Sequence, residues 1–351
     1  MPKKKANRLI KSIADMDNLR LAFWKARKGK SYSGQVERYR SHLETNLVRL
    51  RGQILSGAVE VGNYHFFKIF DPKERQICAP AFAEQVLHHA LMNLSHEYFE
   101  RVQIYDSYAC RKGKGTYAAL ERAKQFARKN GWFLKLDIRK FFDSVHHSVL
   151  KNQLDRRFKD WELLRIFEKI IDSYCTEPDR GLPIGNLTSQ YFANHFLNGL
   201  DNFVKNDLLV KGYIRYMDDL VLWHHDKAFL KDACSKIGHY VETELCCALK
   251  PPLLNQSAQG LTFLGYRVFP ERLLLAQRSK RRFVRKYREI EENYHAGVWD
   301  ETHCQRKVLP LLAFTQHAAA LAWRKKIILP EHSSDDFDSS DKWSNKIGHL
   351  S

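Results

Sequence analysis

Apolar positions follow two different periods along this chain, and the change from one period to the other outlines its elements. Apolar residues three or four positions apart predict an amphipathic helix over 36–56 and a second helix over 83–101. Between them, aromatic and β-branched residues on either side of a Pro-containing turn predict a hairpin over 64–78. Helix, hairpin and helix therefore make up the N-terminal third.

The stretch from 132 to about 256 has the element order of a split βαβ unit. It reads as a buried strand ending at Asp137, helices over 144–174 and 186–209, a hairpin over 213–223, a helix over 227–244 and a strand near 248–254. This β-α-β-β-α-β order is the split βαβ arrangement. Asp143 stands where the first helix needs an N-cap.

Three carboxylates fall at the ends of these predicted strands. Asp218 and Asp219 are adjacent in the tip of the hairpin 213–223, and Asp137 ends the earlier strand. Neighbouring carboxylates repel, so a cation is expected beside them, and Mg²⁺ is commonly held by one or two carboxylates. A solvated Asp-Asp turn is the alternative. A Gly-rich turn that opens a helix, 181–190, lies between the strand and the hairpin and makes the combination specific.

The segment 278–288 is rich in basic residues of a single sign. Apolar residues at helical spacing on one face predict an amphipathic helix whose other face is basic, as a helix lying along a duplex backbone requires. The candidate nucleic-acid-binding residues are Arg278, Lys280, Arg281, Arg282, Arg285, Lys286 and Arg288. A merely solvated basic face is the alternative.

Composition favours a polyanionic partner. The formal net charge is +18, from 58 Lys and Arg against 40 Asp and Glu. No apolar run is long enough to span a membrane, the basic start is unlike a secretory signal, and scattered cysteines fit reduced thiols, so a cytoplasmic location is expected. The segment 331–351 is acidic and serine-rich and is expected to be disordered.

Together these blocks resemble reverse transcriptases, and more narrowly those of bacterial diversity-generating retroelements. The resemblance rests on 136–142, 181–190, 215–219, 263–266 and 106–116, and extends from about 18 to about 323. Group II intron, retron and phage-defence reverse transcriptases share most of the blocks. The fold implied is α+β, a right-hand polymerase with fingers, a βαββαβ palm and a short helical thumb.

The resemblance also implies a division into domains. An N-terminal basic segment and fingers would occupy 1–130, the palm with the catalytic motifs and a primer-grip hairpin 131–270, the helical thumb 271–329, and the acidic tail 330–351.

Particular residues acquire roles from the match. Asp137, Asp218 and Asp219 would be catalytic and, with the Ile138 carbonyl, would hold two Mg²⁺ ions, with Mn²⁺ as an alternative. The residues that would contact the incoming deoxynucleoside triphosphate are Arg75, Lys73, Phe142, Ile184, Gly185 and Lys250. Ile184 stands where most reverse transcriptases carry Gln.

The function implied is an RNA-directed DNA polymerase that copies a template RNA into cDNA, error-prone at template adenines. Its partners would be template RNA, an RNA–DNA duplex, deoxynucleoside triphosphates and a small basic helical accessory protein, with no membrane. The alternatives are an antiphage defence or a retron or group II intron-like reverse transcriptase, an RNA-binding splicing factor with vestigial motifs, and a plain basic RNA-binding protein.

Overall fold

The structure is a computed structural model that describes residues 9–30, 33–70 and 74–329. Lys73 and the acidic tail therefore lie outside the described residues. The chain forms two compact units, each assembled from separate stretches of sequence. The first comprises Met1–Gly113, Lys135–Val221 and Lys231–Leu253, and the second Lys114–Leu134, Leu222–Leu230 and Leu254–Ser351. Because the units interleave in sequence, the contiguous domains expected above remain a prediction.

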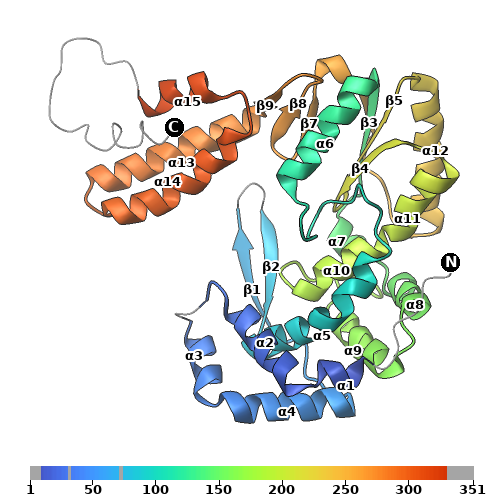
Figure 1. The fold of residues 1–351 in the computed structure, drawn as a ribbon, viewed down its shortest axis with the longest axis vertical. Coiled ribbons are helices and arrows are strands. Elements are labelled where there is room, and N and C mark those ends of the chain that lie inside the picture. The colour runs from blue at the N-terminus through green and yellow to red at the C-terminus, as the bar shows by residue number, and fades with distance from the viewer. Residues whose placement is uncertain (1–8, 31–32, 71–73, 330–351) are drawn as a thin grey trace. The chain divides into compact units, whose positions relative to one another are not determined.

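The N-terminal part of the first unit is a group of helices with one hairpin (Figure 1). Its elements are α1 (Ile10–Ile13), α2 (Met16–Arg27), α3 (Gly34–Ser41), α4 (Leu43–Ser56), β1 (Tyr64–Ile69), β2 (Arg75–Pro80) and α5 (Phe82–Glu100). The predicted hairpin is confirmed, with Phe66 opposite Cys78. The single helix predicted over 36–56 is wrong, because the backbone leaves helical geometry at His42 and divides it into α3 and α4.

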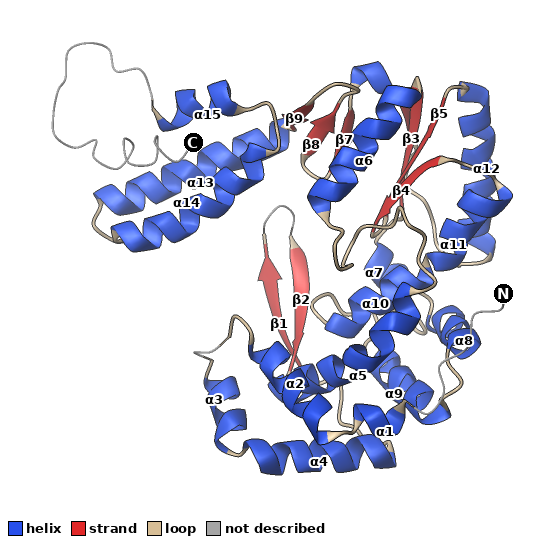
Figure 2. Cartoon of the chain, viewed as in Figure 1, coloured by secondary structure: helices blue, strands red, loops and turns tan. Residues whose placement is uncertain are grey.

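A four-stranded sheet carries the predicted split βαβ order. Its strands are β3 (Trp132–Asp137), β4 (Gly212–Tyr216) and β5 (Asp219–His224), which Figure 2 labels, and β6 (Leu253–Gln256). Their spatial order is β4-β5-β3-β6. Between β3 and β4 lie α7 (Phe141–Ser144), α8 (His147–Arg157), α9 (Trp161–Asp172), α10 (Leu187–Phe196), α11 (Asn198–Asn202) and a π-helix (Phe203–Asp207), and α12 (Lys227–Thr243) joins β5 to β6. The predicted β-α-β-β-α-β order is therefore confirmed.

The region after β3 is more broken than predicted. In place of one helix over 144–174 the chain forms α7, α8 and α9. The expected cap by Asp143 is wrong, because α7 starts at Phe141 after a left-handed Lys140 and so takes Asp143 into its first turn. The residue preceding α8 is His146, which makes no side-chain capping bond. Asp160 is a true cap, accepting a 3.1 Å hydrogen bond from the Leu163 amide.

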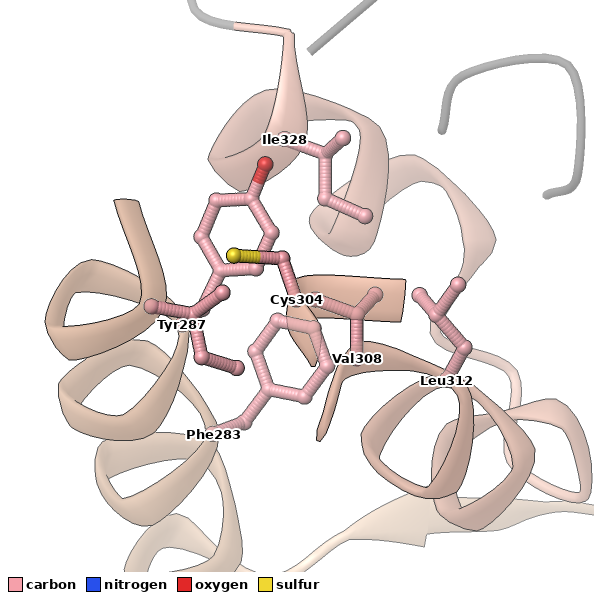
Figure 3. Close-up of a cluster of buried hydrophobic side chains, with 7 residues drawn as sticks. Phe283, Tyr287, Cys304, Val308, Leu312 and Ile328 are labelled. Carbon is pink, nitrogen blue, oxygen red and sulfur yellow. The ribbon is translucent and has the colours of Figure 1, made fainter. Parts of the chain in front are cut away.

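The second unit combines a helix, a small sheet and three C-terminal helices. It contains α6 (Thr116–Lys129), the antiparallel strands β7 (Leu261–Phe263), β8 (Tyr266–Val268) and β9 (Leu273–Leu275), then α13 (Gln277–His295), α14 (Glu301–Gln316) and α15 (Leu321–Ile328). A buried cluster joins the last three helices through residues such as Phe283, Tyr287, Val308 and Ile328 (Figure 3). A short non-helical connection after Gln316 separates α14 from α15.

Among the described residues no helix is long and apolar enough to cross a membrane.

Candidate active site

The sheet order brings the three predicted carboxylates to neighbouring strands. Asp137 is the last residue of β3, Asp219 is the first of β5, and these strands are hydrogen-bonded neighbours. Met217, before Asp218, has a φ of 54°, the left-handed geometry that turns the chain between β4 and β5. The expectation that Asp137 would lie on a strand next to the Asp218 hairpin is therefore confirmed.

Burial and the charges of Asp219 and Asp137 affect the pKa of Asp218. Burial, followed by the charges of Asp219 and Asp137, raises the pKa of the Asp218 carboxyl to about 6, although the backbone amide of Asp218 and the ammonium of Lys250 oppose the rise. Burial and two anionic neighbours therefore disfavour the ionised form of Asp218. A cation bound nearby would stabilise that ionised form.

Two lysines already provide part of that positive charge. Lys250 Nζ lies 2.6 Å from Asp137 Oδ1, and Lys135 Nζ lies 3.0 Å from Asp219 Oδ1. Backbone pairing holds Lys250 in position, because its amide donates to the Asp137 carbonyl at 2.8 Å. Lys250 was predicted to contact the triphosphate, whereas its ammonium here contacts a carboxylate. Sequence reasoning missed Lys135, although residues two apart on a strand point to the same face.

These ion pairs affect how the carboxylates fit a metal ion. Within residues 9–30, 33–70 and 74–329, no group of three or more His, Cys, Asp or Glu side chains gathers closely enough to hold one. The donors nevertheless suit a hard divalent cation, since they are carboxylate oxygens on adjacent strands and one of them has a raised pKa. The donor atoms of Asp137, Asp218 and Asp219 thus suit a divalent cation, but Asp137 and Asp219 are paired with lysines here, and the metal site remains a prediction.

A buried ion pair, which the sequence did not reveal, supports the hairpin from behind. Arg215 on β4 donates to both carboxylate oxygens of Asp201 in α11, and neither side chain is exposed. Arg215 Nη1 also donates to the Met217 carbonyl at 3.2 Å, and the Tyr213 hydroxyl donates to Asp201 Oδ1 at 2.8 Å. The available signal was an arginine inside an apolar strand, which requires a buried acidic partner. This network fixes the backbone just before Asp218.

A cavity of about 1170 Å³ lies in the first unit beside these elements. Its lining includes four basic residues, Arg75, Arg139, Lys140 and Arg180, together with Ile184 and Tyr174. Two predicted nucleotide contacts, Arg75 and Ile184, therefore share one cavity. Phe142 is not among the described lining residues; it is half-buried, with its ring 5.6 Å from that of Phe141. The lining also holds four acidic residues, Glu74, Asp143, Glu177 and Glu242, so its formal charges balance. The size of the cavity suits a ligand as large as a nucleotide.

Gly185 allows the β1–β2 hairpin and the Gly-rich turn to approach each other closely. Its φ is +124°, and a Cβ there would lie 2.9 Å from the Cys78 carbonyl oxygen of β2. The Cys78 amide donates to the Ile184 carbonyl at 2.8 Å. Gly185, predicted as a nucleotide contact, thus permits a backbone contact three residues from Arg75.

The comparison with protein families decides the identity of the chain. The family described as reverse transcriptase (RNA-dependent DNA polymerase) matches residues 71–268, more than half of the sequence. The chain belongs to the reverse transcriptase family.

Similar proteins include a group II intron-encoded protein and a putative intron protein. The chain is 25% identical over 138 residues to the group II intron-encoded protein LtrA of Lactococcus lactis subsp. cremoris, covering 38% of this chain and 23% of LtrA. It is 28% identical over 109 residues to a putative COX1/OXI3 intron 2 protein of Saccharomyces cerevisiae, covering 29% and 13%. The match therefore spans less than a quarter of either relative.

A solved structure with a similar fold is telomerase from Candida tropicalis in complex with a TWJ fragment of telomeric RNA. Its TM-score is 0.50 at 12% identity, and the match covers 79% of this chain and 58% of that one. With the split βαβ sheet and the family match, this likeness confirms the α+β, right-hand polymerase fold expected for a reverse transcriptase.

In this reverse transcriptase the seven basic residues predicted on α13 do not share one surface. Lys280, Arg281, Arg285 and Arg288 line a groove of about 730 Å³ together with Trp323 of α15. Arg282 instead lies over the Phe314 ring of α14, 5.4 Å from its centroid. Arg278 and Lys286 are also outside the groove lining. The basic helix therefore presents four of its seven predicted contacts together.

Proposed function

We propose that this chain is an RNA-directed DNA polymerase that extends a primer on a template RNA. The observation that carries the proposal is the convergence of Asp137 and the Asp218–Asp219 hairpin on adjacent strands of a reverse transcriptase palm. The cavity in the same unit supports a nucleoside triphosphate substrate by its size and by the presence of Arg75 and Ile184 in its lining. The basic face of α13 supports an RNA–DNA duplex as the second ligand.

The roles of the carboxylates follow from their charge. Asp137, Asp218, Asp219 and the Ile138 carbonyl would hold two Mg²⁺ ions, or Mn²⁺ in their place. Bound there, such ions would activate the primer hydroxyl and neutralise charge on the phosphate under attack. The chain's own residues orient the reactants: the Arg215–Asp201 pair fixes the hairpin, and Arg75 offers a bidentate fork to a phosphate. Lys250, whose ammonium lies beside Asp137, would donate a proton to the departing pyrophosphate.

The subdivision into fingers, palm, thumb and tail belongs to the same proposal. In it the hairpin β1–β2 is part of the fingers and holds the triphosphate, and α13 to α15 form the thumb. Lys73, the second predicted triphosphate contact, lies outside the described residues.

The lineage proposed within the family is the diversity-generating retroelement type. Its support is Ile184, an apolar side chain in the cavity wall at a position where an amide would otherwise hydrogen-bond. An apolar wall discriminates between nucleotides by only ~1–3 kcal/mol. Sequencing cDNA made on a defined RNA tests this. We expect misincorporation mainly opposite adenine and its reduction by Ile184→Gln, whereas faithful copying of adenine by the unaltered enzyme would reject the lineage.

A group II intron-like reverse transcriptase is the second candidate, favoured by the intron-encoded relatives. Antiphage defence and retron roles share the same chemistry. A variable gene with a near-identical repeat beside the coding region supports the retroelement, and its absence supports the other roles. A small basic helical accessory protein belongs to the retroelement proposal, and co-purification of such a protein from the source cell tests it.

Primer extension tests the polymerase proposal itself. With poly(rA)/oligo(dT), dTTP and Mg²⁺, we expect template-dependent lengthening of the primer. RNA binding without extension would favour a splicing factor or a plain RNA-binding protein.

A further inference from the structure

The groove on α13 is a strongly cationic feature of the second unit. Its floor follows one face of the helix, from Gln277 through Arg281, Val284 and Arg288 to Glu292, and Trp323 of α15 forms a wall. Lys280 lies over the Trp323 ring, 5.6 Å from its centroid. Four cations line the groove against two carboxylates, those of Glu289 and Glu292.

The guanidinium groups of the groove are available for an anionic partner. Arg281, Arg285 and Arg288 are exposed, and none of them makes an ion pair within the described part of the chain. These three guanidinium groups lie within about two helical turns, and with Lys280 they outnumber the carboxylates of Glu289 and Glu292 four to two, which creates a local positive potential that favours a polyanion. The groove therefore fits a chain of closely spaced negative charges.

Such a chain follows directly in the sequence. Residues 331–341 contain five carboxylates and no Lys or Arg: Glu331, Asp335, Asp336, Asp338 and Asp341. The described chain reaches Leu329, two residues earlier, at the end of the helix that provides Trp323. Ile328 and Leu329 pack on the cluster that includes Phe283 and Tyr287 of α13 (Figure 3). The acidic segment thus begins from a point fixed against the grooved helix.

Chain length allows the segment to reach the whole groove. Trp323 and Leu329 are separated by ~9 Å along a helix at ~1.5 Å per residue. The twelve residues from Leu329 to Asp341 can extend ~40 Å, whereas the α13 residues of the groove span only ~22 Å. A segment tethered this closely has an effective concentration in the millimolar range.

We propose that the acidic segment 331–341 occupies the α13 groove, where its carboxylates take the positions of duplex phosphates. The contact between the segment and the groove does not depend on the proposed function. Its effect on duplex binding does rest on the proposed function, since a duplex must displace the segment. The segment then acts as an internal competitor that weakens duplex binding at low ionic strength. Screening shortens the reach of such charges to a few ångströms at high salt, so the competition fades there.

Carbodiimide cross-linking of the full chain tests the contact without nucleic acid. The reagent joins a carboxylate to a lysine amine in direct contact, and Lys280 is the lysine in the groove. We expect peptide mapping to find 331–341 joined to Lys280 at about 50 mM salt, and the product to be lost at about 0.5 M. If the segment is joined only to other lysines, or to none, the proposal is overturned, whatever the protein does as a polymerase.

A double-mutant cycle tests the competition. In the full chain, replacing Asp335, Asp336, Asp338 and Asp341 by Asn should tighten binding to an RNA–DNA duplex about tenfold at low salt. Replacing Ser333, Ser334, Ser339 and Ser340 by Ala keeps the charges and serves as the matched control. In a background with Arg281, Arg285 and Arg288 changed to Gln, the gain should disappear. If the same tenfold gain persists there, the segment repels the duplex from elsewhere and the inference fails.

Discussion

Arg215 Nη2 lies 2.7 Å from Asp201 Oδ2, and neither side chain is exposed to solvent. The same guanidinium donates to the carbonyl of Met217, the residue before Asp218. Backbone bonds extend the support, because the Arg215 amide donates to the Asp106 carbonyl and its own carbonyl accepts from Tyr108, each at 3.0 Å. A buried pair thus determines where the hairpin that carries Asp218 and Asp219 turns.

Breaking this pair should be costly. Arg215→Met leaves the Asp201 charge buried and alone, so the free energy of unfolding should fall by roughly 3–5 kcal/mol. Chemical denaturation measures the change. Arg20→Met, which breaks an exposed pair with Glu44 at 2.9 Å, is the matched control and should have little effect.

The double variant Arg215→Met, Asp201→Leu separates stability from function. It removes both charges and should recover much of the stability, but not activity, because the Met217 carbonyl still lacks its donor. Full activity in the double variant would contradict a positioning role for Arg215.

Gly185→Ala should weaken nucleotide binding. The new Cβ would meet the Cys78 carbonyl at 2.9 Å in a left-handed backbone, so the turn and the strand that carries Arg75 must shift apart. We expect the KM for deoxynucleoside triphosphate to rise about tenfold or more, with little change in RNA binding. Gly52→Ala in α4, where a Cβ meets nothing within 4 Å, is the control. An unchanged KM would show that this contact does not control the cavity.

Phe142→Ala tests sugar selection. The resemblance puts this ring under the incoming sugar, where it would clash with a 2′-hydroxyl, whereas in the structure it is half-buried against Phe141. If the first role holds, the variant should incorporate ribonucleotides more readily relative to deoxyribonucleotides, and Phe142→Tyr, which keeps the ring, should not. An unchanged ratio in an active Phe142→Ala enzyme would make Phe142 a packing residue only.

The raised pKa of Asp218 makes a prediction about stability. Because the folded carboxyl has a pKa of about 6, higher than in the unfolded chain, the folded state binds this proton more tightly. Stability is therefore unaffected below about pH 4 and falls as the pH rises through 6. Asp218→Asn should raise the free energy of unfolding at pH 8 by roughly 2–3 kcal/mol at most, and the gain should vanish at pH 4.

Mg²⁺ should offset the loss of stability that ionisation of Asp218 causes in the unaltered protein. A bound cation relieves the repulsion among the carboxylates, so Mg²⁺ should raise the Tm at pH 8 and should not do so for Asp218→Asn. Asp232→Asn removes an exposed carboxylate paired with Lys236 and should keep the response. An equal Mg²⁺ response in Asp218→Asn would mean that the ion binds elsewhere.

Local patterns in the sequence were sufficient for the palm and its carboxylates. A buried apolar run located Asp137, and aromatic and β-branched residues on either side of a polar tip located the Asp218 hairpin. The order of elements then predicted a sheet in which the two are neighbours. Partners far apart in sequence were not predictable, because periodicity carries no information about which buried acid meets Arg215. The helix breaks at His42 and after Ser144 were also missed, because the tertiary packing overrides an apolar period that continues through them.

Sequence patterns also could not predict which basic residues of α13 lie together on one surface. Charge and period predicted that α13 is amphipathic, and Phe283 and Tyr287 are indeed buried. The packing of α14 and α15 determines which basic residues lie together. Arg282, for example, lies over the Phe314 ring of α14 and not in the groove.

Primer extension with matched variants tests the central claim most directly. On poly(rA)/oligo(dT), the unaltered enzyme and Asp232→Asn should extend the primer. Asp218→Asn should lose at least ~100-fold in rate, about 3 kcal/mol of transition-state stabilisation, while its affinity for the duplex stays within about twofold. Extension by Asp218→Asn at the unaltered rate, or no extension by the unaltered enzyme in Mg²⁺ or Mn²⁺, would contradict the assignment of this carboxylate hairpin as a polymerase active site.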